Sequence, residues 1–291
     1  MPAGAPLSRR ALLARLLAAG TAAAIAPATL RAIARDLADD GTEGRPLGVQ
    51  LYTLRTLLRT DLEGTLAAVA AIGYREVEPF NWYGRDGAEW AALLRTHGLV
   101  APSAHVPLPK DDAEWRVTLA TARAVGVQWV VIPWLPPAEY RSRDAWERLA
   151  ARLNALGAQA AGEGMRLAYH NHDFEFSPVT GGGSGWEVLV ASLDPSVCDL
   201  EVDLFWMVRG GLSPYTQLPK LRNVRLLHCK DIGPDPGYAM VDVGAGTLDW
   251  RRLARLARRA GVRHLFVEHD TPADPLASVR RSFAALARAT A

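Results

Sequence analysis

The sequence predicts an α/β fold, a (β/α)8 TIM barrel, from three observations. From residue 46 onward, a short β-rich run and a longer helical run follow one another eight times, which is typical of βα units on a parallel sheet. Eight such units in about 245 residues match the usual size of this barrel. No glycine fingerprint opens a helix after the first strand, which disfavours the competing doubly wound open sheet. We therefore expect one barrel domain over residues 46–288.

The strands are predicted where apolar and β-branched residues form short runs. We expect them at 47–53, 75–80, 99–106, 129–134, 166–172, 198–206, 225–231 and 264–270. The segments between them have helical spacing. In 62–74, for example, Leu66 and Val69 fall on one helical face and Gly73 ends the helix before the next strand.

Residues 1–35 are predicted to be a targeting segment and are excluded from the fold. The stretch "SRRALLARLL" places paired arginines before an apolar, alanine-rich run, which is typical of a twin-arginine export signal. Arg15 interrupts this run, which is also shorter than the ~20 residues that span a bilayer, so we expect no permanent membrane anchor. The alternative is an ordinary amphipathic N-terminal helix. The signal predicts a periplasmic protein.

The basic charge of the chain belongs to this segment. Residues 1–35 hold five arginines and no acid, so the formal net charge of +2 becomes −3 over residues 36–291. Because phosphate binding needs a clustered positive face, the barrel is not expected to bind nucleic acid. Cys198 and Cys229 fall near opposite ends of neighbouring predicted strands, so we expect no disulfide between them.

Polar residues gather where the later strands end. Residues two apart on a strand share a face. The pairs that share a face are Glu76 with Glu78, His170 with His172, Glu201 with Asp203, His228 with Lys230, and Glu268 with Asp270. The C-terminal ends of barrel strands converge on the mouth, where enzymes of this architecture place their chemistry. Strands five to eight therefore deliver His, Asp, His and Glu to one point.

This group of side chains predicts one divalent metal ion. Polar groups are costly to bury unless they are paired or bind an ion, and one cation satisfies two carboxylates and two neutral imidazoles together. Mixed nitrogen and oxygen ligands suit Mn, Zn, Co or Fe better than Mg or Ca. The alternative is a salt-bridged rim in which Asp203, His228, Lys230 and Glu268 neutralise one another.

Seven stretches of the barrel carry a resemblance to a known family. They are "VQLYTLR", "GYREVEPF", "YHNHDFEF", "EVDLFWMVRGG", "HCKD", "VGAGTLDW" and "FVEHD". Together they make residues 46–288 resemble the sugar phosphate isomerase/epimerase-like family of xylose isomerase-like TIM barrels. That family includes sugar epimerases, inosose dehydratases, hydroxypyruvate isomerases, keto-glycoside-cleaving lyases and type IV AP endonucleases. The resemblance therefore implies one fold but several different activities.

The resemblance implies a metal held by residues that end strands five to eight. These residues are His170, Asp203, His228 and Glu268. Strand five departs from the family, because His170 stands in "YHN" where the family usually has glutamate, and a metal-bound histidine cannot accept a proton as a carboxylate does. His172 is the alternative ligand on this strand. Strand six has Trp206 where the family often has a histidine.

The remaining candidates are predicted to act on the substrate. Glu268 or a metal-bound water is the expected base, and Lys230 or His172 would stabilise or protonate the oxyanion or enolate that forms. The residues expected to contact substrate are Glu78, His105, Trp134 and Trp206, with Trp82 and Phe205 as further stacking candidates. The structural alternatives are an ion pair of Lys230 with Asp231 or Asp270, a hydrogen-bonded core histidine, and core packing of the aromatic rings.

These features predict a metal-dependent isomerase/epimerase-like enzyme or lyase that abstracts a proton beside the carbonyl of a keto- or hydroxy-sugar. Because one family carboxylate is missing, elimination or hydrolysis of a 3-keto glycoside, or dehydration of a keto-polyol, fits as well as isomerisation. Export argues against a sugar phosphate. The alternative class is a non-catalytic periplasmic sugar-binding protein on the same barrel. A nuclease is disfavoured by the negative barrel and by the lack of further histidines.

Overall fold

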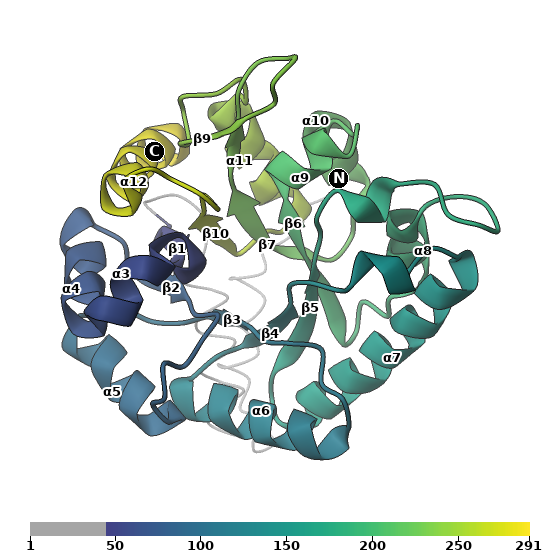
Figure 1. The fold of residues 1–291 in the computed structure, drawn as a ribbon, viewed down its shortest axis with the longest axis horizontal. Helices are drawn as coiled ribbons and strands as arrows, with labels where there is room; N and C mark the ends of the chain where they lie inside the picture. The colour runs from purple at the N-terminus through teal and green to yellow at the C-terminus, as the bar shows by residue number, and fades with distance from the viewer. Residues whose placement is uncertain (1–44) are drawn as a thin grey trace, which may run out of the picture. The chain divides into compact units, whose positions relative to one another are not determined.

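A computed structural model describes residues 45–291, which form a nearly closed barrel (Figure 1). Eight parallel strands make one sheet in the order β2-β1-β10-β7-β6-β5-β4-β3. Their bounds are Gly48–Gln50 (β1), Glu76–Glu78 (β2), Ser103–His105 (β3), Trp129–Ile132 (β4), Arg166–His170 (β5), Cys198–Asp203 (β6), Val224–Cys229 (β7) and His264–Val267 (β10). The two ends of the sheet also meet, because the amide of Val77 in β2 donates to Val100, just before β3, at 2.9 Å, and the amide of His105 in β3 donates to Pro79, just after β2, at 2.8 Å. The predicted (β/α)8 barrel is confirmed.

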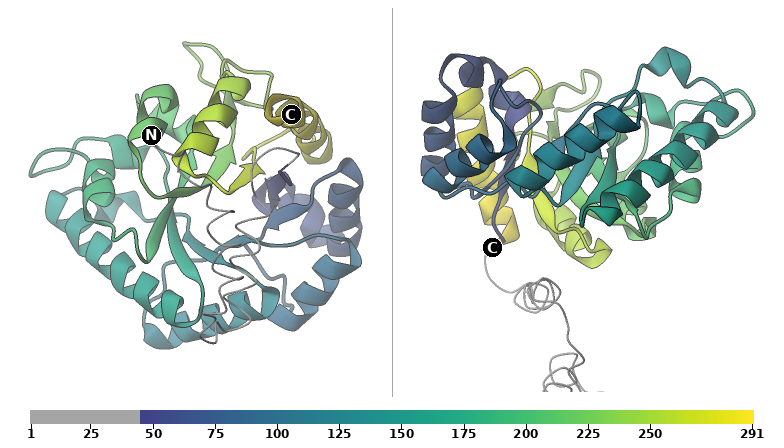
Figure 2. Two further views of the ribbon diagram at one scale, coloured as in Figure 1. Left: turned by 180° about the vertical axis from the view of Figure 1, so that it is seen from behind. Right: turned by 90° about the horizontal axis from the view of Figure 1, so that it is seen from below.

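Helices surround the strands, as Figure 1 and the view from behind in Figure 2 show. The α-helices are Arg55–Thr60 (α3), Leu62–Ile72 (α4), Gly87–Thr96 (α5), Asp112–Val125 (α6), Arg143–Gly162 (α7), Gly185–Ser192 (α8), Leu204–Arg209 (α9), Pro214–Gln217 (α10), Trp250–Ala260 (α11) and Pro275–Thr290 (α12). Short 3₁₀ helices cover Leu51–Leu54, Pro137–Glu139, Phe174–Phe176 and Leu218–Lys220. The ring of helices closes where Phe283 of α12 packs edge-on against Tyr74, just after α4, at 4.8 Å between ring centroids.

The predicted export signal lies outside the described residues. Within residues 45–291, none of the helices has both the length and the apolar character that crossing a bilayer requires. Cys198 and Cys229 are buried and free.

Several strands are shorter than the sequence predicts, and the reason is visible at β6. Asp203 ends this strand, and its carboxylate accepts a hydrogen bond from the amide of Trp206 at 2.9 Å. An aspartate in this position caps a helix, so the chain turns into α9 instead of continuing the strand to residue 206. His172 and Glu268 likewise lie beyond the last residues of β5 and β10. Strand alternation therefore does not determine where these two side chains point.

The barrel interior is apolar below the mouth. A separate cluster of buried side chains fills this level: Trp129, Val131, Ala168, Leu226 and Phe266. Gly48 faces the same level, and a Cβ atom there would lie 2.4 Å from the ring of Phe266, so only glycine fits. Toward the C-terminal ends of the strands, the inward positions become polar. This change in character sets the floor of the candidate site.

Asp231 holds the long segment between β7 and α11, which includes the hairpin of β8 (Asp231–Ile232) and β9 (Met240–Val241). Its buried carboxylate accepts hydrogen bonds from the amides of Ile232, Gly244 and Leu248 and from the indole nitrogen of Trp250. With four donors it is satisfied without Lys230. Of the two candidate ion-pair partners of Lys230, Asp231 and Asp270, it is Asp270 that contacts the lysine.

Candidate active site

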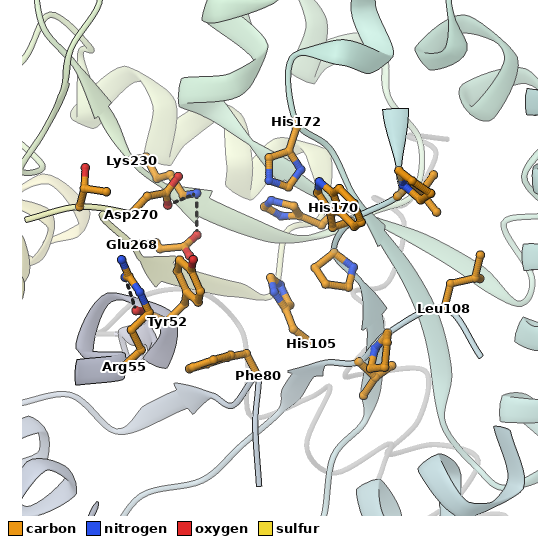
Figure 3. Close-up of a pocket in the computed structure, with 17 residues that line it drawn as sticks. Tyr52, Arg55, Phe80, His105, Leu108, His170, His172, Lys230, Glu268 and Asp270 are labelled. Carbon is orange, nitrogen blue, oxygen red and sulfur yellow. Dashed lines mark hydrogen bonds and ion pairs between the residues drawn. The ribbon is translucent and has the colours of Figure 1, made fainter. Parts of the chain in front are cut away.

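A pocket of about 630 Å³ opens where the strands end (Figure 3). Its polar lining residues are Arg55, His105, His170, His172, Lys230, Glu268, Asp270 and Thr271. Its other walls are Tyr52, Phe80, Val106, Pro107, Leu108, Pro133, Trp134, Leu135 and Pro136. Figure 3 shows Lys230, Asp270 and Glu268 on one side and the histidines facing them. The pocket thus combines one charged face with largely apolar walls.

Asp203, Glu268 and the Nδ1 atom of His228 form the upper group. Their ligand atoms all lie within 4.8 Å of one another. Glu268 Oε2 is 2.7 Å from His228 Nδ1, and Asp203 Oδ2 is 3.9 Å from it. All three atoms are buried and none has a hydrogen bond of normal geometry within residues 45–291. Both oxygens also lie against Lys230 Nζ, at 3.1 and 2.8 Å, so the group is an ion-paired cluster whose donor types and spacing suit a cation.

Lys230 lies beside the upper group. Its Nζ atom is 3.1 Å from Asp203 and 2.8 Å from both Glu268 and Asp270. The side chain is only 2 % exposed, so its charge acts at close range in a medium of low polarity. The salt-bridged rim considered above is therefore present, but it leaves the Nδ1 atom of His228 without a hydrogen bond.

His105, His170 and Glu201 form the lower group, on the opposite side of His228. Glu201 Oε2 is 2.7 Å from His105 Nε2 and 3.3 Å from His170 Nδ1. The same oxygen is 3.3 Å from His228 Nε2, which lies closer, at 2.7 Å, to Glu78 Oε2. Glu78 also accepts a hydrogen bond from the side-chain amide (Nε2) of Gln50 at 2.9 Å. Each ring nitrogen of His228 thus faces a different set of carboxylates.

Burial and charge together set the ionisation of the upper group. Burial raises the pKa of Asp203 to about 6. Burial also opposes ionisation of Glu268, but the charges of Lys230 and His228 hold its pKa well below the usual value. Burial acts against the charge of His228 too, yet Glu201 and Glu268 raise its pKa well above the usual value. At neutral pH Glu268 is a carboxylate, the form that serves as a base or a metal ligand.

Both histidines of "YHNH", His170 and His172, are neutral at neutral pH. Burial, together with the charge of His228, lowers the pKa of His170 well below its usual value. Burial and Lys230 lower the pKa of His172 to about 3. A neutral imidazole is the form that binds a metal ion. At neutral pH His172 would meet a substrate as an uncharged hydrogen-bonding group and not as a cationic acid.

Glu175 fixes the segment that carries His172. Its carboxylate accepts hydrogen bonds from the hydroxyl of Tyr169 at 2.8 Å and from the amide of His172 at 2.9 Å. The side chain is fully buried, and burial raises its pKa to about 7. Sequence analysis had no specific role for this residue.

We expect Glu175→Gln to reduce the pH dependence of stability. Because the folded pKa is about 7 against a usual 4.5, the native state holds a proton that the unfolded state releases between these values. Stability from this group is therefore present below pH 4.5 and is lost as pH rises through 7, by about 3 kcal/mol. Urea unfolding at pH 5 and pH 8 measures this difference. The exposed Glu139→Gln should keep the wild-type dependence, and an unchanged dependence in Glu175→Gln would contradict the assignment.

The structure brings most of the predicted site residues together. Those that line the pocket are His105, Trp134, His170, His172, Lys230 and Glu268. Asp203 and His228 lie directly behind them, at 0 % exposure. His170 is nearer to the lower group than to the upper one, since its Nε2 atom is 3.9 Å from Asp203. Its role as the fourth ligand of the upper group stays a prediction.

Three residues that are predicted to contact the substrate do not line the pocket. Glu78 is fully buried beneath His228 and does not line the pocket. Trp206 packs beside His172, with 5.3 Å between ring centroids, and the Nζ atom of Lys230 lies 5.7 Å from its ring. Trp82 stacks edge-on against Trp90. Trp134, by contrast, is 54 % exposed at the pocket wall, where a ring could stack on a sugar.

The position of Glu201 among the histidines was not predicted from the sequence. The residue is on the same face as Asp203, two positions earlier, and that pairing was visible in the sequence. Only the strand-terminal member is predicted as a ligand, whereas the earlier member, Glu201, lies among His105, His170 and His228. Tyr52 and Arg55, which follow β1, also line the pocket without any sequence signal.

Comparisons with known proteins identify the family of the barrel. The family model described as "Xylose isomerase-like TIM barrel" matches residues 66–289. An inosose dehydratase from Clostridium botulinum (strain Alaska E43 / Type E3) is 24% identical over 196 residues, which cover 60% of this chain and 64% of that protein. The match thus spans less than two thirds of that relative's length.

Two solved structures have the same fold. A sugar phosphate isomerase/epimerase from Parabacteroides distasonis ATCC 8503 superposes with a TM-score of 0.76 at 22% identity, over 86% of this chain and 96% of the other. The IOLI protein, solved with a bound zinc atom, gives a TM-score of 0.68 at 16% identity, over 84% and 98% of the two chains. With a family model matched over most of its length, the chain belongs to the xylose isomerase-like TIM barrel family.

Proposed function

We propose that this protein is a metal-dependent enzyme that abstracts a proton beside the carbonyl of a keto- or hydroxy-sugar. The observation that carries the proposal is the upper group, whose three buried donor atoms converge beside Lys230 and leave the Nδ1 atom of His228 without a hydrogen bond. One imidazole and two carboxylates are ligands that suit Mn, Zn, Co or Fe. Asp203, His228 and Glu268 would hold the ion. When bound, it would polarise the oxygens of the substrate.

Three residues, Glu268, Lys230 and His172, would take part in the proton transfer. Glu268 is ionised and lines the pocket, so it is placed to take the proton from carbon. The ammonium group of Lys230, 2.8 Å from Glu268, would stabilise the negative oxygen that forms. His172, held by Glu175, would donate a hydrogen bond to the same intermediate. The apolar walls would exclude water from it.

The pocket suits a sugar with an additional group. Its volume of about 630 Å³ falls in the range of pockets that enclose drug-sized ligands, larger than one sugar ring requires. Apolar walls at Phe80, Leu108 and Trp134 suit the aglycone of a 3-keto glycoside. The name of the dehydratase relative supports elimination as one outcome. We propose export by the twin-arginine signal, which disfavours phosphorylated sugars.

Metal removal tests the proposed function. The chelated protein should lose turnover of keto-sugars, 3-keto glycosides or keto-polyols and regain it with Mn²⁺, Zn²⁺, Co²⁺ or Fe²⁺. Calorimetry on the same compounds separates binding from turnover. Full activity after complete chelation would overturn the metal requirement. Binding without turnover for every compound would favour the sugar-binding alternative.

A further inference from the structure

The polar floor of the barrel contains two ligand groups and not one. His228 separates them, since its Nδ1 atom faces Glu268 at 2.7 Å and its Nε2 atom faces Glu78 at 2.7 Å. The contact with Glu78 is a hydrogen bond. A histidine that gives one nitrogen to a metal and the other to a carboxylate is held in one orientation. His228 is therefore accounted for by the upper group, and the lower group needs its own explanation.

The spacing of the lower group fits a tetrahedral ion. Ligands bound at ~2.0 Å in a tetrahedron lie about 3.3 Å apart. Glu201 Oε2 is 3.3 Å from His170 Nδ1 and 2.7 Å from His105 Nε2, and one ligand atom from each of the three residues lies within 4.8 Å of the others. The donors come from three different strands, so the barrel itself fixes their positions.

Hydrogen bonding within the described residues leaves this group incomplete. His170 is 2 % exposed and Glu201 is 0 % exposed. The Nδ1 atom of His170 and the Oε1 atom of Glu201 have no hydrogen-bond partner, although both are buried. The one hydrogen bond of normal geometry in the group joins His105 and Glu201. Unpaired donors and acceptors of this kind are costly unless something binds them.

Charge gives the same indication. Glu78 and Glu201 are both fully buried and share His105, at 3.4 Å and 2.7 Å. Lys230 pairs with the carboxylates on the other side of His228 and not with these two. The partners of these two carboxyl groups are instead the histidines His105, His170 and His228, which are donors that a divalent ion would also bind.

We propose that His105, His170 and Glu201 bind a second divalent metal ion, separate from the ion of the upper group. Two imidazoles and one carboxylate are a donor set that suits zinc and leaves a fourth position for water or substrate. That position would open into the pocket, because His105 and His170 both line it. The inference rests on different residues from the proposed reaction and does not depend on it, except that His170 is here a ligand of the lower ion.

Metal stoichiometry tests the second site. The protein is stripped with a chelator, reloaded with Zn²⁺, passed through a desalting column and analysed by mass spectrometry for zinc per chain. We expect two equivalents in the wild type, one in Glu201→Gln and one in Asp203→Asn. Glu76→Gln is the matched control, since Glu76 is also a buried carboxylate beside a histidine, 2.9 Å from His264, and should retain two.

The outcomes distinguish the two sites. One equivalent in the wild type, unchanged in Glu201→Gln, would overturn the second site. Loss of zinc in Glu201→Gln with none lost in Asp203→Asn would support the second site and overturn the upper one. His105→Ala, at a less buried position, provides the same test if Glu201→Gln does not give the wild-type circular dichroism spectrum. No assay of turnover enters this measurement.

Discussion

Glu268→Gln is expected to lose turnover by ~10²- to 10⁴-fold, because an amide cannot accept the proton that the carboxylate takes. It should also bind metal more weakly, since the amide is a neutral and poorer donor than a carboxylate next to His228. Because the Glu268 carboxylate is 2.7 Å from His228, we expect this one substitution to produce both effects. Steady-state kinetics and metal analysis of the same preparation measure them together.

Asp270→Asn is the matched control for this change. Asp270 is bonded to the same lysine at 2.8 Å but lies outside the upper group, so its variant should keep the wild-type metal content. Wild-type turnover in Glu268→Gln would contradict the assignment of the base. Unchanged metal affinity combined with lost turnover would limit Glu268 to proton transfer.

The second large effect is a difference in metal content and turnover between the His170→Ala and His172→Ala variants. His170→Ala should lower the metal content, because its buried Nδ1 atom faces Glu201 and has no hydrogen-bond partner among the described residues. His172→Ala should keep the metal and slow turnover by ~10²- to 10⁴-fold, as expected when a group that moves or holds a proton is lost. Metal analysis and kinetics of the two variants give the comparison.

The opposite pattern would reverse the roles of these histidines. Metal retained in His170→Ala but lost in His172→Ala would move the ligand two residues along the chain. The pKa of about 3 for His172 adds a further expectation. Because this histidine stays neutral above that value, its removal should not shift the pH profile of turnover near pH 6.

The architecture could be predicted because it repeats. Each βα unit carries its own apolar pattern and its own stop signal, such as Gly73 after α4, so eight weak signals support one another. Strand ends were less predictable. Asp203 is compatible with an inward-facing strand residue and with a helix cap, and the structure shows that it is both. The capping role ends β6 earlier than the apolar run "LFW" suggests.

The candidate site was predictable at the strand ends and not below or around them. His170, Asp203, His228 and Glu268 follow from the rule that strand C-termini meet at the mouth. Glu201 could not be assigned by that rule, because its contact with His105 joins β6 to β3, which are not neighbours in the sheet, and its contact with His170 depends on the register of β6 on β5. Contacts between distant strands depend on register, which the sequence of one strand does not specify.

Deuterium exchange tests the central claim most directly. The metal-loaded protein is incubated in D₂O with a keto-sugar or 3-keto glycoside that it binds, and the recovered sugar and product are analysed by NMR. We expect deuterium at a carbon beside the carbonyl, in amounts that fall to background after chelation and in Glu268→Gln. Turnover of such a compound with no deuterium at any position beside the carbonyl would contradict proton abstraction by this site.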